Sequence, residues 1–181
     1  MELIKRIKHQ LHDRMIEKRL SNKIQRKSID FEMVKEVGII FNGTELKDRQ
    51  EVEAFKEKWQ KLGKSIYLLC FFDSKEPQPN LTVDHFTKAQ VNWLGKIQSE
   101  KVDSFIQEEF DLMISCSQEQ VLNDIAAMSK SKLRVGPITE KDYCYDLMIS
   151  RDQNKGAKQY LEQIERFLTK LKQGKHAKKT I

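Results

Sequence analysis

The sequence predicts a three-layer α/β sandwich around a mostly parallel sheet. Almost continuously apolar runs stand at residues 34–41, 65–72 and 110–115, as expected for strands that are buried on both faces of a sheet. Amphipathic stretches with apolar residues at helical spacing alternate with these runs along the 181-residue chain. We therefore expect a Rossmann-like sheet of about five strands with a long basic N-terminal helix.

The first half of the chain reads as helix, strand, helix and strand. Residues 1–28 contain apolar side chains at steps of three to five and no Gly or Pro, which predicts one amphipathic helix. The run at 34–41 predicts a strand that turns at the next two residues. A helix follows, with Asp48 near its start and Gly63 at its end, and leads into the strand at 65–72.

The second half continues the alternation. The expected elements are a Pro-containing loop at 73–84, a short helix opened by Thr87 and Gln90, a strand at 110–115, a helix opened by Ser117 and Gln120, strands at 133–136 and 145–150, and a closing helix at 157–173. Only eight residues separate the last two strands, fewer than a parallel crossover needs. We expect them to be antiparallel, or the first of them to be a stub at the sheet edge.

The chain length fits one domain, with residues 1–30 as a basic amphipathic helix, 31–173 as a single α/β domain and 174–181 as a basic tail. No apolar run approaches the roughly 20 residues of a membrane span. The opening residues form a basic amphipathic stretch, unlike the apolar core of a signal peptide. Three cysteines without paired spacing indicate a reducing compartment, so we expect a cytoplasmic protein.

Positive charge is concentrated at the two ends of the chain. Residues 1–28 hold nine basic and three acidic side chains, and residues 166–181 hold six basic and none acidic, so the remaining body is acidic overall. Such ends attract a polyanion locally and with strong salt dependence. The alternative is that these charges are solvated helix faces. The expected nucleic-acid-binding residues are Lys5, Arg6, Lys8, Arg14, Lys18, Arg19, Lys23, Arg26, Lys27, Lys172, Lys175, Lys178 and Lys179.

A small-ligand site is expected at the carboxyl ends of the strands, where open α/β sheets bind their ligands. The segment after 110–115 leads into a helix N-terminus, whose backbone N–H groups suit a phosphate or carboxylate. The alternative role of Ser117 is to cap this helix. Asp146 joins the site if its strand is antiparallel. The candidate ligand-binding residues are Asn42, Gly43, Ser115, Ser117, Gln118 and Asp146.

Motifs of the common enzyme classes are missing from the sequence. There is no GxGxxG, no GxxxxGK[ST] and no GxSxG, which argues against a dinucleotide site, a P-loop and a hydrolase nucleophile. No ligand set completes a metal site around His9 and His12, which we interpret as part of the cationic helix. Cys116 is interpreted as a small core residue. We expect no catalytic residue, metal or cofactor, and lean against an enzyme.

Five segments resemble a bacterial family known only as a domain of unknown function. They are KEVGIIFN (35–42), FTKAQVNWLGK (86–96), FDLMIS (110–115), SKSKLRVGP (129–137) and YDLMIS (145–150). This resemblance implies a small α/β domain without an established activity. The order of FDLMIS, a helix and SKSKLRVG is also similar to the N-terminal half of heptosyltransferase-type glycosyltransferases. The chain lacks their Gly-Asp loop and donor-binding second domain, so no catalytic residue carries over.

We therefore expect a non-catalytic protein that binds RNA, such as the ribosome, through its basic ends. The alternative is a small-ligand-binding or transferase-like enzyme with its site at the carboxyl ends of the strands. Membrane attachment through residues 1–24 ranks last, because this segment lacks Trp and Phe. If the N-terminal helix packs on the body, we expect the side with Leu3, Ile7 and Leu11 to be buried.

Overall fold

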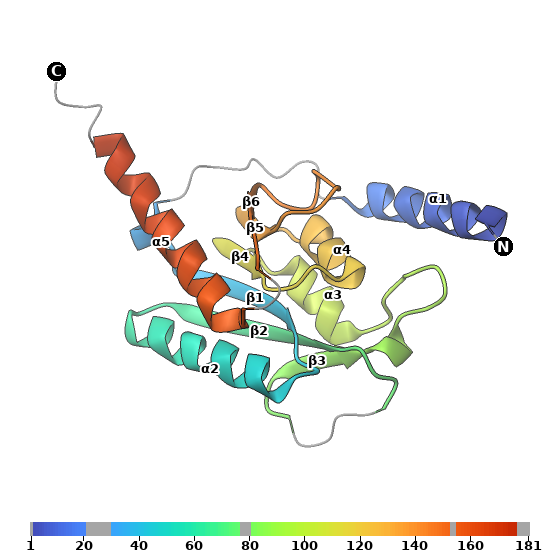
Figure 1. The fold of residues 1–181 in the computed structure, drawn as a ribbon, viewed down its shortest axis with the longest axis horizontal. Coiled ribbons are helices and arrows are strands. Elements are labelled where there is room, and N and C mark those ends of the chain that lie inside the picture. The colour runs from blue at the N-terminus through green and yellow to red at the C-terminus, as the bar shows by residue number, and fades with distance from the viewer. Residues whose placement is uncertain (1, 21–29, 77–80, 153–154, 177–181) are drawn as a thin grey trace.

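The computed structural model describes residues 2–20, 30–76, 81–152 and 155–176. Its helices are α1 (Glu2–Arg19), α2 (Leu46–Lys61), α3 (Glu100–Gln107), α4 (Gln120–Met128) and α5 (Ala157–His176), and its strands are β1 (Glu36–Asn42), β2 (Ser65–Phe72), β3 (Asp84–Thr87), β4 (Leu112–Ser115), β5 (Leu133–Pro137) and β6 (Leu147–Ile149). The strands form one parallel sheet in the order β3-β2-β1-β4-β5-β6 (Figure 1). The expected α/β class is confirmed, with one strand more than expected.

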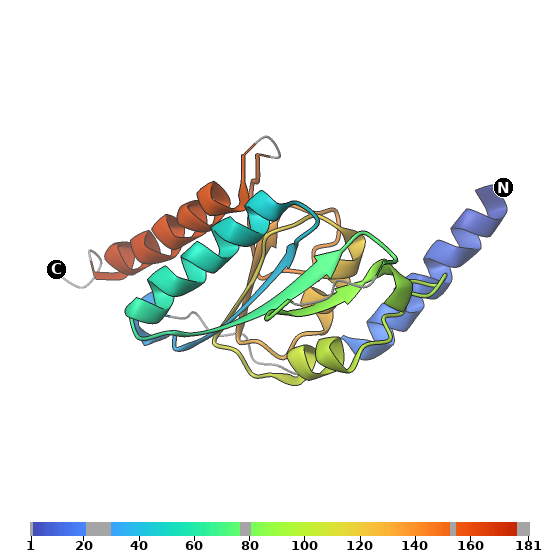
Figure 2. The same ribbon diagram turned by 90° about the horizontal axis from the view of Figure 1, so that it is seen from below.

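Two layers of helices cover the sheet. α2 and α5 lie side by side on one face, and α3, α4 and part of α1 cover the other (Figure 2). Successive side chains of β1 alternate between these layers, so Ile39 packs in the core that contains Trp59, and Ile40 packs in the core that contains Met113. Because both faces are buried, nearly every position of the central strands has to be apolar.

The edge strand β3 was not expected from the sequence. Its four residues, Asp84–Thr87, pair with the end of β2 and place Phe86 against Phe71, with ring centroids 5.1 Å apart. Three of its four residues are polar, which hides the strand pattern. The turn signal that follows is confirmed, because the backbone N–H of Thr87 donates to Oε1 of Gln90 at 3.0 Å. The helix there is a single 3₁₀ turn, Lys88–Gln90.

The expected antiparallel pairing of the last two strands is wrong. β5 and β6 are parallel, with Val135 opposite Leu147. They pair over only three residues, so the connecting segment has to return roughly 10 Å along the strand and needs no crossover helix. β6 therefore begins at the amino edge of the sheet, and Asp146 lies there, away from the expected ligand site.

The aspartates of the two similar segments FDLMIS and YDLMIS have matching structural roles. The Asp111 carboxylate accepts from the backbone N–H of Lys35 at 2.8 Å and from Nζ of Lys132 at 2.7 Å. Asp146 accepts from the backbone N–H of Arg134 at 2.8 Å and from its guanidinium at 3.1 Å. Burial raises the pKa of Asp111, but its hydrogen bonds outweigh burial and leave the pKa below its ordinary value. Both aspartates join neighbouring strands at the amino edge.

Helix α1 packs on the body through its C-terminal half, and its N-terminal end projects away from the sheet (Figure 2). Ile16 is fully buried and Met15 is partly buried, both against the core beneath α3 and α4. Ile7 and Leu11 stay 47% and 43% exposed, so the side expected to be buried is the wrong one. The side chain of Leu3 lies outside the described part of the chain. Among the described helices, none has the length and apolar composition that crossing a bilayer requires.

Candidate functional site

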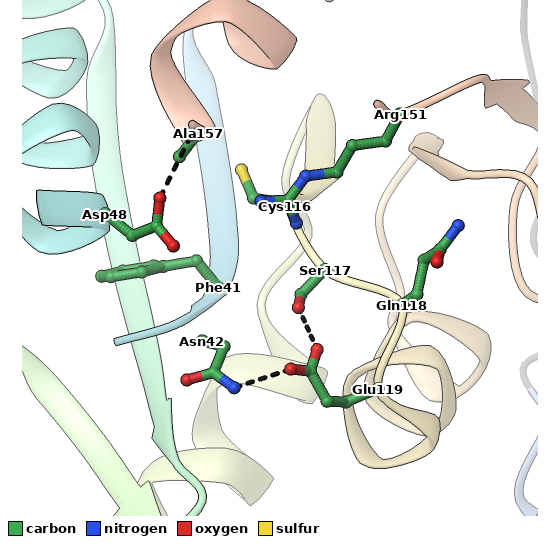
Figure 3. Close-up of a pocket in the computed structure, with 9 residues that line it drawn as sticks. All are labelled: Phe41, Asn42, Asp48, Cys116, Ser117, Gln118, Glu119, Arg151 and Ala157. Atoms are coloured by element: carbon green, nitrogen blue, oxygen red, sulfur yellow. Dashed lines mark hydrogen bonds between the residues drawn. The ribbon is translucent and has the colours of Figure 1, made fainter. Parts of the chain in front are cut away.

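A pocket opens at the carboxyl edge of the sheet between β1 and β4, and we call it the switch-point pocket (Figure 3). The chain leaves β1 for α2 on one face and leaves β4 for α4 on the other, so the two loops diverge and leave a hollow between them. Its volume is about 430 Å³. The lining residues are Phe41, Asn42, Asp48, Cys116, Ser117, Gln118, Glu119, Arg151 and Ala157.

The structure brings together three of the six expected ligand-binding residues, Asn42, Ser117 and Gln118. Gly43 does not line the pocket, and the sulfur of Cys70 leaves no room for a Cβ atom at this position. Ser115 is fully buried, and its hydroxyl donates to the backbone oxygen of Ser117 at 3.1 Å. Asp146 lies at the opposite edge of the sheet, because β6 runs parallel to its neighbour.

Glu119 is a pocket residue that the sequence analysis missed. Its carboxylate accepts from Nδ2 of Asn42 at 2.6 Å and from the hydroxyl of Ser117. Because α4 begins at Gln120, Glu119 occupies the N-cap position that the sequence predicted for Ser117. These two hydrogen bonds fix the Glu119 side chain on the pocket wall.

Asp48 enters the pocket from the first turn of α2. Its Oδ1 accepts from the backbone N–H of Ala157 at 3.2 Å, and Glu51 accepts from the next backbone N–H, that of Lys158, at 2.9 Å. The two carboxylates thus satisfy the first N–H groups of α5 from a different helix, next to its positive dipole end. α2 itself begins at Leu46, two residues before the position that the sequence indicated.

Arg151 reaches the pocket from the segment that follows β6. Its guanidinium carbon lies 5.8 Å from the ring centroid of Tyr160. The Nε atom is buried and has no hydrogen-bond partner among the described residues. Sequence analysis missed Arg151 because an antiparallel β6 would end at the other edge. The available signal was an arginine directly after the apolar segment YDLMIS.

The thiol of Cys116 lies in the pocket wall and is fully buried. Burial raises its pKa to about 12, so it remains protonated at neutral pH and is not an activated nucleophile. Burial also raises the pKa values of Cys70 and Cys144 to about 12. Within the described ranges, no three His, Cys, Asp or Glu side chains are placed to hold a metal ion.

A second hollow, which we call the α1 groove, lies between α1 and the body. Its volume is about 420 Å³, and cations from two distant parts of the chain line it. Lys5 and Lys8 come from α1, whereas Lys88 and Lys141 come from the body. The remaining lining residues are His9, His12, Val91, Asn92, Leu94, Gly95, Gln120, Val121 and Asp124.

A buried hydrogen bond holds α1 at this groove. Nε2 of His12 lies 2.7 Å from Oδ2 of Asp124, and Nε2 of Gln120 donates to Oδ1 of the same carboxylate at 2.6 Å. The hydrogen bond with Asp124 raises the pKa of His12, against the effect of burial. His12 is therefore a docking residue and not part of an exposed cationic face. His9 differs, because it is exposed and pairs with Asp13 at 2.8 Å.

The expected nucleic-acid-binding residues fall into two groups. The described members on α1 are exposed, namely Lys5, Arg6, Lys8, Arg14 and Lys18. The side chains of Arg19, Lys172 and Lys175, and the whole of Lys23, Arg26, Lys27, Lys178 and Lys179, lie outside the described part. Helices α1 and α5 end at opposite sides of the molecule, so their described portions do not form one continuous surface (Figure 1).

Trp93 lies beside the α1 groove and is 66% exposed. Its sequence neighbours, Asn92 and Leu94, both line the groove. A short helix opened by Thr87 and Gln90 was expected to run through this segment. Instead, the chain makes a turn closed by a bridge between Val91 and Ile97, and this turn leaves the indole in solvent.

Comparison with known proteins identifies a family but no characterised relative. No curated protein and no solved structure shows significant similarity to the chain. The resemblance to heptosyltransferases therefore gains no support. The model of a family of unknown function, DUF6913, matches residues 8–171, from α1 into α5. The chain therefore belongs to this family of unknown function.

Proposed function

We propose that the protein binds structured RNA through the α1 groove and the exposed cationic face of α1. The observation that carries this proposal is the meeting of cations from two parts of the chain, Lys5 and Lys8 on α1 with Lys88 and Lys141 on the body, around one hollow. A phosphodiester backbone is recognised mainly by such clusters of positive charge.

The cations on α1 are the ones available to a ligand. Lys88 pairs with Asp73 at 2.7 Å, and Lys141 pairs with Asp13 at 2.9 Å. Within the described part of the chain, Lys5 forms no ion pair, and the same holds for Lys8. Phosphates would therefore meet uncompensated charge at the outer wall of the groove and partly neutralised charge at its inner wall.

The exposed Trp93 favours RNA over other polyanions as the ligand of this groove. An exposed indole beside a cationic groove can stack on an unpaired base, whose π-face no simple polyanion offers. The apolar side chains of Val91, Leu94 and Val121 in the groove favour the same partly aromatic ligand. Structured RNA with an unpaired loop supplies both the phosphates and the base.

The docking of α1 supports this proposal further. His12 and Ile16 hold the helix on the body, so Lys5 and Lys8 project from a helix that is fixed at its other end. Cations whose positions are set before binding lose less conformational entropy when they meet phosphates. The expected affinity is therefore higher than that of a free basic peptide of the same sequence.

The test is fluorescence anisotropy with a labelled RNA stem–loop, titrated from about 50 to 200 mM salt. The variant Lys5→Glu/Lys8→Glu is expected to lose affinity by about tenfold or more and to show a shallower salt dependence. The matched control, Lys61→Glu/Lys158→Glu, makes the same charge change at exposed positions on the α2 and α5 layer. This control is expected to bind nearly as well as the natural chain. Trp93→Ala is expected to weaken binding about fivefold or more.

Two results would overturn the proposal. One is the absence of RNA binding by the natural chain at low salt. The other is an equal loss of affinity in the two charge-reversal variants, which would indicate unspecific attraction to net positive charge. Binding to anionic lipid vesicles without binding to RNA would replace the proposal with membrane attachment through the exposed Ile7 and Leu11.

A further inference from the structure

We infer that the switch-point pocket is a separate binding site for a small anion that carries hydroxyl groups, such as a sugar phosphate or a hydroxy acid. The pocket and the α1 groove lie on different sides of the first turn of α4 and share no lining residue. The inference therefore stands independently of RNA binding.

The need for an anionic group follows from Arg151. Its guanidinium lies at the pocket wall (Figure 3), 5.8 Å from the ring centroid of Tyr160, and its Nε atom is buried without a hydrogen-bond partner in the described part of the chain. A buried donor that has lost water and gained no acceptor is unfavourable. A carboxylate or phosphate oxygen in the pocket would pair with the charged guanidinium of Arg151 in a charge-assisted interaction.

The need for hydroxyl groups follows from the carboxylates on the same walls. Asp48 uses Oδ1 to cap α5 and makes no other hydrogen bond within the described ranges, so its second oxygen remains an acceptor. Glu119 is held in place by Asn42 and Ser117. Together the two carboxylates outweigh the single guanidinium, so a bare anion would meet repulsion. A ligand that donates hydroxyl hydrogens to Asp48 avoids this repulsion.

The pocket has the size and chemistry of a small-molecule binding site. Its volume of about 430 Å³ falls within the range of small-molecule sites. Cys116, the one thiol in its wall, remains protonated because burial raises its pKa to about 12. Phe41 and Ala157 add apolar surface against which a carbon skeleton can pack.

The test is a titration calorimetry panel of ribose 5-phosphate, gluconate and inorganic phosphate with the full-length protein. Ribose 5-phosphate or gluconate is expected to bind more tightly than inorganic phosphate, and the comparison of the first two distinguishes a phosphate ester from a carboxylate. Arg151→Gln is expected to weaken this binding about tenfold or more, and Arg151→Lys to restore part of it. Circular dichroism of each variant checks that it folds.

Asp48→Asn gives a second test, because it is expected to change the affinities for two ligands in opposite directions. The amide keeps an oxygen for the N–H of Ala157 but removes the charge. It is expected to weaken binding of the hydroxylated anion and to strengthen binding of inorganic phosphate. Lys5→Glu/Lys8→Glu is expected to leave the small-ligand affinity unchanged, which separates this inference from the RNA proposal. Failure of every panel member to bind, or equal affinity in folded Arg151→Gln, would overturn the inference.

Discussion

Replacing His12 with glutamine is expected to loosen α1 from the body. In the folded protein His12 is 8% exposed, and its partner Asp124 is 1% exposed. The ring also lies against Gly95, where it fills the space that a side chain would take. His12→Gln removes the ring and its positive charge from the only hydrogen bond that joins α1 to α4 among the described residues, and leaves at most a neutral amide donor.

The expected loss of stability is about 1–2 kcal/mol, because a buried hydrogen bond between two charged groups stabilises the fold more than one donated by a neutral amide. Asp124 keeps its bond from Gln120, so the carboxylate is not left entirely without a donor, and this limits the loss. The matched control is His9→Gln on the same helix. His9 forms an exposed pair with Asp13, whose removal is expected to cost about 0.5 kcal/mol or less.

The same hydrogen bond predicts a pH dependence. Because Asp124 raises the pKa of His12 above its ordinary value of 6.5, protonated His12 stabilises the folded state. This stabilisation is complete below the unfolded pKa and is lost as the pH rises through the raised folded pKa. The neighbouring Asp13 favours the protonated form and Lys141 opposes it.

Urea unfolding followed by circular dichroism, at pH 6 and at pH 9, measures both effects. The natural chain is expected to lose more stability over this interval than His12→Gln, and a nuclear magnetic resonance titration of His12 gives its pKa directly. Equal stability of the His9 and His12 variants, or an unchanged pH dependence in His12→Gln, would refute the assignment of His12 as the docking residue.

Two further predictions concern the backbone and the amino edge of the sheet. Gly95 and Gly63 both have positive φ angles, 85° and 79°, but only a Cβ at Gly95 would meet the ring of His12. Gly95→Ala is therefore expected to lower the melting temperature more than Gly63→Ala, which carries the conformational cost of about 1 kcal/mol alone. Asp146→Asn weakens the pair with Arg134 and is expected to lower the free energy of unfolding by about 1–2 kcal/mol in urea, whereas no change would contradict the structural role of Asp146.

The central sheet could be predicted because its strands are buried on both faces. β1 and β2 each carry long apolar runs, and a run of this length between turn residues is typical of a strand with helices on both sides. β3 could not be predicted, since its pairing depends on Phe86 meeting β2 and not on any pattern within its own four residues. The direction of β6 could not be predicted either. Only three of its residues pair with β5, so a short connection is enough for a parallel strand, and the sequence does not show how many residues pair.

The candidate site could be predicted only where a residue lies at or just beyond the carboxyl end of a strand of known direction. Asn42 and Ser117 satisfy this rule, and both line the pocket. Arg151 satisfies it too, but only once β6 is known to run parallel. The place of Asp48 and Glu119 in the pocket was not predicted, because each stands at the start of a helix. A carboxylate is common there, since it interacts favourably with the backbone N–H groups and the dipole of its own helix. Their bonds to distant segments arise from tertiary packing.

Consecutive residues at the start of α4 line the two hollows: Gln118 and Glu119, just before the helix, line the switch-point pocket, and Gln120, its first residue, lines the α1 groove. Glu119 bonds to Asn42 in the switch-point pocket, and the next residue, Gln120, bonds to Asp124, the partner of His12 in the α1 groove. A ligand that displaces Glu119 therefore acts on the backbone that positions Gln120, one peptide bond away. Any effect of the small ligand on RNA affinity must be matched by an equal effect of RNA on small-ligand affinity, because coupling between two binding equilibria is reciprocal. The segment that leads from β4 into α4 thus separates two hollows with chemically different linings.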